Sequence, residues 1–440
     1  MRVTKAWARL ARYGAGITAL VLAVGAAFSQ DAQNKRETEG KLINAAFKAY
    51  QTKNYAEFLA LEKQALALDP ENPRVIYNVA CGESLQGNAK EAVRRLNELT
   101  ARKLDLGAEG DGDFEGIRKT PEWSEYEAKL AELRRTVVTK SNVAFTLEDP
   151  QLVATGIAYD AKTGDVFVAS VRERKIVKRG KGGAISDFVQ EGQDGFLSGA
   201  SLAIDSQRGI LYASTSAAPY MRGYSKGDFG KTGVFAFDLK TGKTLRKVWL
   251  EAKGQFHFLN ALAIDLAGTV YVSDSGEAGI YRWTAGGETL EKFMGAETFG
   301  ATQGLAFSDD EKTLYVADYS NGVWAVDIAT KQARWVPGPE GVWLGNLDGL
   351  ARVPDGFIAV QIQVKPERVL LLKLDQKLQK ISSVEILEFN RPDYQSPIQG
   401  TVGNGAFLYV ANSQLDLGNG RTGEFAAERA KPTMVLKLPL

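Results

Sequence analysis

The chain has 440 residues, of which 44% are hydrophobic and 24% charged, a composition typical of a globular protein long enough for two domains. Its 54 basic and 53 acidic residues nearly cancel, which argues against nucleic acid as a partner. With one cysteine and one histidine, the chain has no residues for an internal disulfide, a Cys/His zinc cage or a haem-attachment motif. Neither a haem nor a nucleotide cofactor is expected.

Residues 1–29 are predicted to be a secretory signal peptide. Four basic residues precede an apolar run over residues 17–28, and the small residues Ala27 and Ser29 suit cleavage. The alternative is an uncleaved anchor, but the run is shorter than the roughly twenty residues that a membrane span needs. The sequence therefore predicts a periplasmic or secreted protein with no stable membrane span after cleavage.

Residues 37–138 are predicted to form a small all-α domain, because apolar residues recur there at helical spacing. The helices resemble tetratricopeptide repeats, although Phe58 departs from the pattern. The small positions of two such repeats fall at Ala46, Ala65, Ala80, Gly87 and Ala92. The resemblance implies a concave surface for a protein partner. The alternative is a spacer, since three repeats are normally needed for independent stability.

Residues 142–440 are predicted to form an all-β six-bladed β-propeller. Six stretches repeat one pattern of apolar run, turn and second apolar run, at a spacing of about forty to sixty residues. They begin at Thr155, Ala200, Asn260, Gln303, Asp348 and Gln399. Two further apolar segments follow each stretch, which predicts four strands per blade. We expect residues 143–147 to pair with residues 434–438 as the outermost strand of the last blade, which would close the ring.

Strand alternation places the starts of the first strands and the ends of the second strands at one face of the propeller. His257 and two long insertions, residues 217–231 and 413–432, belong to the same face. A polar mouth walled by loops is the expected binding site. Residues expected to contact a small-molecule ligand there are Asn260, Asp274, Asp318 and Gln361. Alternatively, Asp274 and Asp318 cap turns at strand ends.

Asn260, Gln303 and Asp348 offer oxygen ligands that converge on one axis, the type of donor that a divalent cation such as calcium accepts. Such a cation can polarise a carbonyl oxygen during ester or lactone hydrolysis. Asp348 would be the anionic ligand and a catalytic base. The alternative is that these side chains satisfy strand-end backbone groups or hold channel water.

Residues 145–438 resemble the senescence marker protein/gluconolactonase family of six-bladed propellers, distant relatives of the paraoxonases. The resemblance is greater to secreted bacterial members with an N-terminal tetratricopeptide segment. The matching stretches are HFLNALAID, TQGLAFSDDEKTLYVADYSNGVWAVD, NLDGL, VKPERV and YVANSQ.

In that family a Glu from blade one, an Asn from blade four and an Asp from blade five hold the cation, and an Asn from blade three lies near the substrate. Asp348 matches the Asp and Asn260 matches the blade-three Asn. Gln303 replaces the blade-four Asn, and Thr155 stands in place of the Glu. The resemblance also implies a proton-carrying histidine at the mouth, which would be His257. Alternatively, His257 is a packed loop residue bonded to a carbonyl.

Two functions follow from these residues. The first is a cation-dependent hydrolase of lactones or small carboxylic esters, with Asp348 and His257 as catalytic residues and Asp348, Gln303 and Asn260 at the metal. The second is a non-catalytic propeller that binds a sugar-derived ligand, peptide or protein, with the helical repeats as an adaptor. Thr155 favours the second function, whereas Asp348 and Asn260 favour the first. A quinone- or haem-dependent oxidoreductase is disfavoured by the scarcity of histidines.

Overall fold

The computed structural model describes residues 35, 38–251, 255–377 and 379–440. These residues divide into two compact units, Met1–Leu133 and Arg134–Leu440. The predicted signal peptide, residues 1–29, lies outside the described residues. Among the helices that the structure describes, none is long and apolar enough to cross a membrane.

The first unit consists of helices joined by short turns. Residues 38–51 form its first described helix. The following elements are α2 (Tyr55–Leu68), α3 (Pro73–Leu85), α4 (Ala89–Ala101), the short 3-10 segments η1 (Ala108–Gly110) and η2 (Gly112–Ile117), and α5 (Pro121–Arg135). The Asn72 side chain accepts a hydrogen bond from the main-chain N–H of Arg74 at 3.1 Å, and Pro73 occupies the first helical position. Both features are favoured at a helix start.

Small residues allow these helices to pack closely. A Cβ atom added to Gly82 would lie 3.0 Å from the Leu59 Cβ, so α2 and α3 approach each other at this glycine. The predicted small positions Ala46, Ala65, Ala80 and Ala92 are all buried, whereas Gly87 adopts a left-handed conformation in the turn before α4. The helices predicted between residues 37 and 138 are therefore present. Their assignment as tetratricopeptide repeats stays a prediction.

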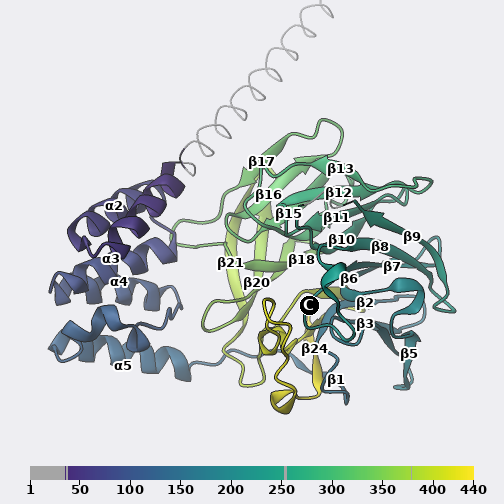
Figure 1. Cartoon of the computed structure of the whole chain (residues 1–440), viewed down its shortest axis with the longest axis horizontal. Helices are drawn as coiled ribbons and strands as arrows, with labels where there is room; N and C mark the ends of the chain where they lie inside the picture. The colour runs from purple at the N-terminus through teal and green to yellow at the C-terminus, as the bar shows by residue number, and fades with distance from the viewer. Residues whose placement is uncertain (1–34, 36–37, 252–254, 378) are drawn as a thin grey trace, which may run out of the picture. The chain divides into compact units, whose positions relative to one another are not determined.

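The second unit is a six-bladed β-propeller of four-stranded antiparallel sheets, as the repeats predicted. Its strands run in chain order from blue through teal and green to yellow in Figure 1. Blades one to three are β2 (Ala154–Tyr159), β3 (Val166–Ser170), β4 (Ile176–Arg179), β5 (Ile185–Val189); β6 (Ser198–Asp205), β7 (Ile210–Ser216), β8 (Thr232–Asp238), β9 (Thr244–Leu250); and β10 (Leu259–Ile264), β11 (Val270–Asp274), β12 (Gly279–Trp283), β13 (Glu291–Met294). Blades four to six are β14 (Thr302–Phe307), β15 (Thr313–Asp318), β16 (Gly322–Asp327), β17 (Ala333–Val336); β18 (Leu347–Val353), β19 (Gly356–Gln361), β20 (Arg368–Asp375), β21 (Lys380–Phe389); and β22 (Gly400–Gly403), β23 (Ala406–Val410), β24 (Thr433–Pro439), β1 (Asn142–Leu147).

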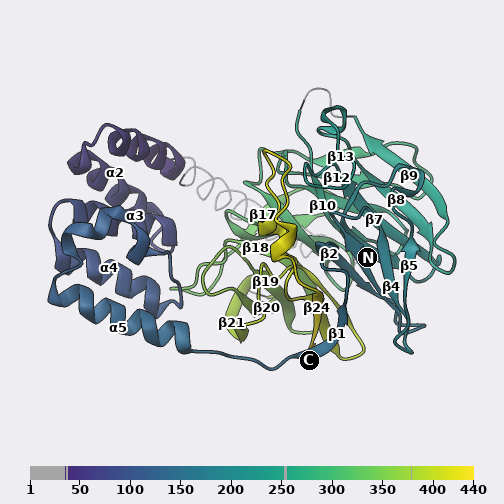
Figure 2. The ribbon, with the colours of Figure 1, turned by 60° about the horizontal axis from the view of Figure 1, so that its bottom comes forward.

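The ring closes as predicted, by pairing the first strand of the unit with the last. β1 lies outermost in blade six, antiparallel to β24, with Thr146 opposite Met434. Figure 2 shows the two strands side by side near the C-terminus. The inner strand β22 also contacts β2. Strands from both ends of the unit are therefore hydrogen-bonded in one sheet, so blade six has its full set of four strands.

Glycines of the inner strands let neighbouring blades meet around the axis. A Cβ atom on Gly304 would lie 2.5 Å from the main-chain nitrogen of Leu350, and one on Gly349 would lie 2.7 Å from the Cα of Gln399. These distances are too short for any side chain. The glycine that follows Gln303 or Asp348 in the repeated pattern is thus required by the approach of the next blade.

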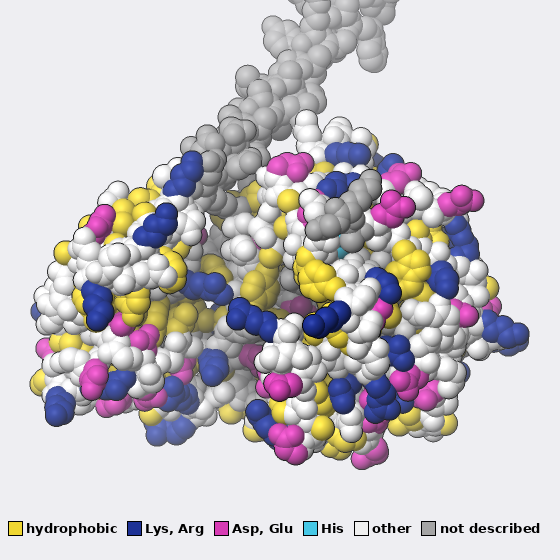
Figure 3. Space-filling model, viewed as in Figure 1, with side chains coloured by type: hydrophobic (Ala, Val, Ile, Leu, Met, Phe, Trp, Pro, Cys, Tyr) yellow, Lys and Arg dark blue, Asp and Glu magenta, His cyan; other side chains and the backbone are white. Residues whose placement is uncertain are grey.

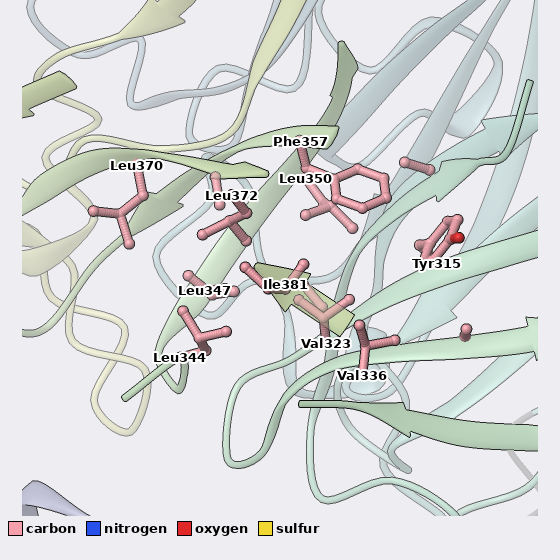
Figure 4. Close-up of a cluster of buried hydrophobic side chains, with 14 residues drawn as sticks. Tyr315, Val323, Val336, Leu344, Leu347, Leu350, Phe357, Leu370, Leu372 and Ile381 are labelled. Atoms are coloured by element: carbon pink, nitrogen blue, oxygen red, sulfur yellow. The ribbon is translucent and has the colours of Figure 1, made fainter. Parts of the chain in front are cut away.

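Apolar side chains between adjacent blades form the core of the propeller. Figure 4 shows the cluster between blades four and five, where the rings of Tyr315 and Phe357 lie 4.7 Å apart. Leu350, Leu370 and Leu372 of blade five complete this part of the cluster. Because each strand alternates its side chains between two blade interfaces, the same strand contributes to two clusters.

Candidate functional site

The structure gathers the predicted cation ligands at the start of the inner strands. The Asn260 side-chain amide donates a hydrogen bond to Gln303 Oε1. Asp348 lies on the next inner strand, and its Oδ2 accepts a hydrogen bond from the main-chain N–H of Gln399 at 3.1 Å. Four of the six residues that begin the repeats therefore form two hydrogen-bonded pairs, each between neighbouring blades.

Thr155 and Gln399 form hydrogen bonds to blade two, mainly to its main-chain carbonyls. The Thr155 hydroxyl donates to the carbonyl oxygen of Gly199 at 2.7 Å. The Gln399 side-chain amide donates to the carbonyl of Ala200 at 3.1 Å, and its Oε1 accepts from the Ser201 hydroxyl at 3.3 Å. Thr155, which stands where the resembling family has a carboxylate, thus contributes a hydroxyl that is already bonded within the protein.

Asp348 is the buried carboxylate of the ring. Its side chain is 7% exposed and, among the described residues, accepts a hydrogen bond from Gln399, while no Lys, Arg or His pairs with it. Burial raises the pKa of Asp348 to about 6, against the lowering effect of the hydrogen bond from Gln399. A buried carboxylate without a basic partner is unfavourable by itself and favours a bound cation.

His257 forms a buried pair with Asp274. The histidine is 3% exposed, and its Nδ1 lies 2.5 Å from Asp274 Oδ2. Asp274 Oδ1 accepts hydrogen bonds from the main-chain N–H groups of Phe258 and Gly276, both at 2.9 Å. His257 is packed, as the alternative prediction had it, but its Nδ1 is bonded to this carboxylate and not to a carbonyl. Because Asp274 holds Nδ1 as the donor, Nε2 is the nitrogen left to accept a proton.

A second acid beside His257 was not identified from the sequence. Glu277 Oε2 lies 3.8 Å from His257 Nδ1 and accepts a hydrogen bond from the Tyr281 hydroxyl at 2.7 Å. Lys292 forms an ion pair with the other oxygen of Glu277. The only local signal was the position of Glu277, three residues after the end of β11 at Asp274.

Asp318 and Gln361, two predicted ligand-binding residues, are fully engaged within the protein. Asp318 accepts hydrogen bonds from main-chain N–H groups, including Gly300 at 2.6 Å and Ser320 at 2.8 Å, and burial raises its pKa. The Gln361 amide donates to the carbonyl of Gly345 at 2.6 Å, and its Oε1 accepts from Arg368 at 2.6 Å. These bonds order strand ends and turns, which is the alternative considered for Asp318.

The two insertions predicted to border the mouth pack against each other over blade one. A Cβ atom on Gly418 would lie 2.6 Å from the ring of Tyr220, so the two segments are in direct contact. Arg172, in the loop after β3, donates a hydrogen bond to the Tyr220 carbonyl at 2.9 Å and lies 4.3 Å from the centre of the Phe425 ring. The insertions therefore cover the blade that carries Thr155.

A cavity of about 520 Å³ occupies the channel on the other side of the ring. It extends from Ser201 and Gln399 to Ser206 and Asp309 at the turns between first and second strands. Its wall includes one alanine from each of five inner strands, Ala158, Ala203, Ala263, Ala306 and Ala351. This cavity reaches the surface at the end opposite to the expected mouth, where no site was predicted from the sequence.

The surface around the propeller carries both signs of charge. In Figure 3, Lys and Arg side chains are mixed with Asp and Glu side chains over the visible face of this unit. Neither sign forms a continuous field on that face. Positive and negative side chains are thus interspersed on this face, in keeping with their nearly equal numbers in the sequence.

These features define a six-bladed propeller with a polar ring on its axis. The sequence matches no protein-family model and no curated protein. Similar solved structures include a luciferin-regenerating enzyme (12% identity, TM-score 0.45, covering 67% of this chain and 95% of that chain). They also include a calcium-binding protein, regucalcin from Agrobacterium tumefaciens (16%, 0.46, 67% and 93%), and virginiamycin B lyase from Staphylococcus aureus (13%, 0.42, 67% and 98%). At such low identities and TM-scores, the function must be argued from this chain's own residues.

Proposed function

We propose that this is an exported propeller which binds a divalent cation, calcium, at its polar ring and hydrolyses a lactone or small carboxylic ester there. The observation that carries the proposal is Asp348, a buried carboxylate with one hydrogen-bond donor and no basic partner among the described residues. Asp348 lies on the inner strand of the blade after that of Gln303, and Gln303 accepts a hydrogen bond from the Asn260 amide.

The donor set fits a weak oxygen-ligand site. Asn260 donates through its nitrogen and leaves its Oδ1 without a donor from the described residues. Gln303 Oε1 accepts one hydrogen bond and retains a second lone pair. With Asp348 these residues supply three oxygens and a single negative charge, so we expect binding on the order of millimolar.

The protein side chains divide the catalytic work. A divalent cation, when bound, polarises a carbonyl oxygen. Asp348 and Asn260 would orient the substrate beside it. His257 would accept a proton at Nε2, because Asp274 holds its Nδ1–H. The charge that develops on His257 would be stabilised by Asp274 and Glu277.

Calcium titration calorimetry on the full chain tests the proposal, followed by a screen of lactones and aryl esters. Asp348→Asn should abolish the calcium heat. Asp355→Asn is the matched control, because Asp355 is an exposed aspartate in the turn after β18, at the opposite end of the same strand. An absence of heat at millimolar calcium would exclude the calcium-dependent hydrolase.

A second candidate function is a non-catalytic propeller that binds a ligand or protein, with the helical unit as an adaptor. It is favoured by Thr155, whose hydroxyl bonds to Gly199 where a second carboxylate would strengthen a cation site. A propeller that binds no calcium but retains a ligand in the channel would support this function.

A further inference from the structure

The helical unit contains a cavity of about 320 Å³ that is separate from the propeller site. Its wall is formed by the helix over residues 38–51, by α2 and α3, and by the segment around η2. Four aromatic side chains line it, Phe47, Tyr50, Phe58 and Tyr77. Three carboxylates share the wall with them, whereas no lysine or arginine is among its lining residues.

Two of the carboxylates are oriented by the tyrosines. The Tyr50 hydroxyl donates a hydrogen bond to Asp113 Oδ1, and the Tyr77 hydroxyl donates to Asp111 Oδ2, both at 2.8 Å. The hydrogen bond to Asp113 raises the pKa of Tyr50, and burial raises that of Tyr77, so both hydroxyls remain neutral donors. No basic residue of the described chain forms an ion pair with Asp111 or Asp113. Their negative charge is therefore balanced by hydrogen bonds alone.

The third carboxylate, Glu62, has one oxygen that lacks a hydrogen-bond donor from the described residues. Glu62 is 1% exposed, and its Oε1 accepts a hydrogen bond from the Asn78 amide at 2.9 Å. Its Oε2 is buried in the wall of the cavity and has no hydrogen-bond partner among the residues that the structure describes. Leaving a buried carboxylate oxygen unpaired costs free energy, which a ligand carrying N–H donors would recover.

The chemistry of the wall favours an organic cation over a soft metal. Cys81 Sγ and carboxylate oxygens of Asp111 and Asp113 lie within 4.8 Å of one another. Burial raises the pKa of the Cys81 thiol, whereas a soft metal requires the thiolate. Aromatic faces beside carboxylates instead suit ammonium and guanidinium groups, which gain both cation–π and charge-assisted hydrogen bonds.

We propose that this cavity binds an alkylammonium or guanidinium group, held by Glu62, Asp111 and Asp113 between the aromatic side chains. The source of the group is either a free amine or the basic side chain of a peptide. The proposal concerns the helical unit alone and does not depend on the function of the propeller.

Titration calorimetry of the full chain with agmatine tests the proposal, with pentanediol as a neutral ligand. Glu62→Gln and Asp113→Asn should each weaken agmatine binding by at least about tenfold, because each removes a charge-assisted hydrogen bond. Glu127→Gln is the matched control, since Glu127 is an exposed glutamate on α5. This variant should bind agmatine as the unchanged chain does. Circular dichroism verifies that each variant is folded. If Asp113→Asn does not fold, the agmatine affinity of Glu62→Gln decides the test.

A second arm identifies the source of the cation. An acetylated Gly-Lys-Gly amide is compared with the same peptide carrying acetyl-lysine. Binding of agmatine alone supports a free amine, and binding of the lysine peptide but not its acetylated form supports a peptide. The proposal is overturned if neither probe binds at millimolar concentration, or if Glu62→Gln binds them unchanged. The proposal is also overturned if agmatine gives no heat of binding while calcium gives one that is lost in Asp113→Asn.

Discussion

Replacing Glu62 with glutamine should make the helical unit less sensitive to pH. Burial raises the pKa of Glu62 to about 7 from its ordinary value of 4.5, and the nearby Glu39 adds to this effect, whereas the hydrogen bond from Asn78 opposes it. Below the ordinary value the side chain is protonated in both the folded and unfolded states. As the pH rises from the ordinary value to the folded value, the unfolded chain releases its proton while the folded chain retains it, so the folded state loses stability until the pH exceeds the folded value.

The size of the effect follows from the two pKa values. Between about pH 5 and about pH 8 the ionisation of Glu62 should cost the folded state about 2 to 3 kcal/mol. Glutamine keeps an oxygen that can accept the hydrogen bond from Asn78 and has no charge to bury. The difference in unfolding free energy between Glu62→Gln and the unchanged chain should therefore grow by about this amount over the same range, in favour of the variant.

Urea unfolding followed by far-ultraviolet circular dichroism measures this difference, because helices dominate that signal. The other ionisable groups of the cavity, Asp111, Asp113 and Cys81, are present in both proteins, so their effects largely cancel in the comparison. Glu127→Gln, on the exposed side of α5, should follow the unchanged chain at every pH. Parallel pH profiles for Glu62→Gln and the unchanged chain would refute the reasoning.

Three further predictions concern the propeller. Thr146→Pro places a residue without an N–H opposite Met434 in the β1–β24 pair and should lower the unfolding free energy by about 1–3 kcal/mol in chemical denaturation; an unchanged midpoint would contradict this pairing. Phe357→Ala empties part of the cluster between blades four and five and should cost about 3–5 kcal/mol, whereas Leu266→Ala, at a side chain 63% exposed, should cost less than about 0.5 kcal/mol. Asp274→Asn should change which ring nitrogen of His257 carries the proton, which nitrogen NMR can follow because the chain has a single histidine; unchanged ring-nitrogen chemical shifts would contradict the pairing.

The blades could be predicted from the sequence because their information is local. Each repeat has alternating apolar residues, a turn, and a polar residue at the strand start, all within consecutive residues. Pairing of residues 143–147 with residues 434–438 is a long-range contact, but it was predictable because a propeller must leave no unpaired edge. The same locality explains why the helices of the first unit were predicted.

The partners of the polar side chains could only be identified in the tertiary structure. Asp274 reaches His257 across a hairpin, and Asn260 bonds to Gln303 from another blade. Spacing in the sequence placed these residues at one end of the strands but did not show that Thr155 would bond to a carbonyl. Side-chain pairing depends on atomic approach across blades, which periodicity does not encode.

The chain by itself determined that six similar blades form and that polar residues begin their inner strands, because both follow from short-range alternation and turn chemistry. The tertiary structure decided which carboxylates are left without a basic partner. Asp348 in the propeller and Glu62 in the helical unit look ordinary in the sequence. Burial and the absence of a pairing base among the described residues give them their chemical importance, and both properties arise only when distant segments pack together.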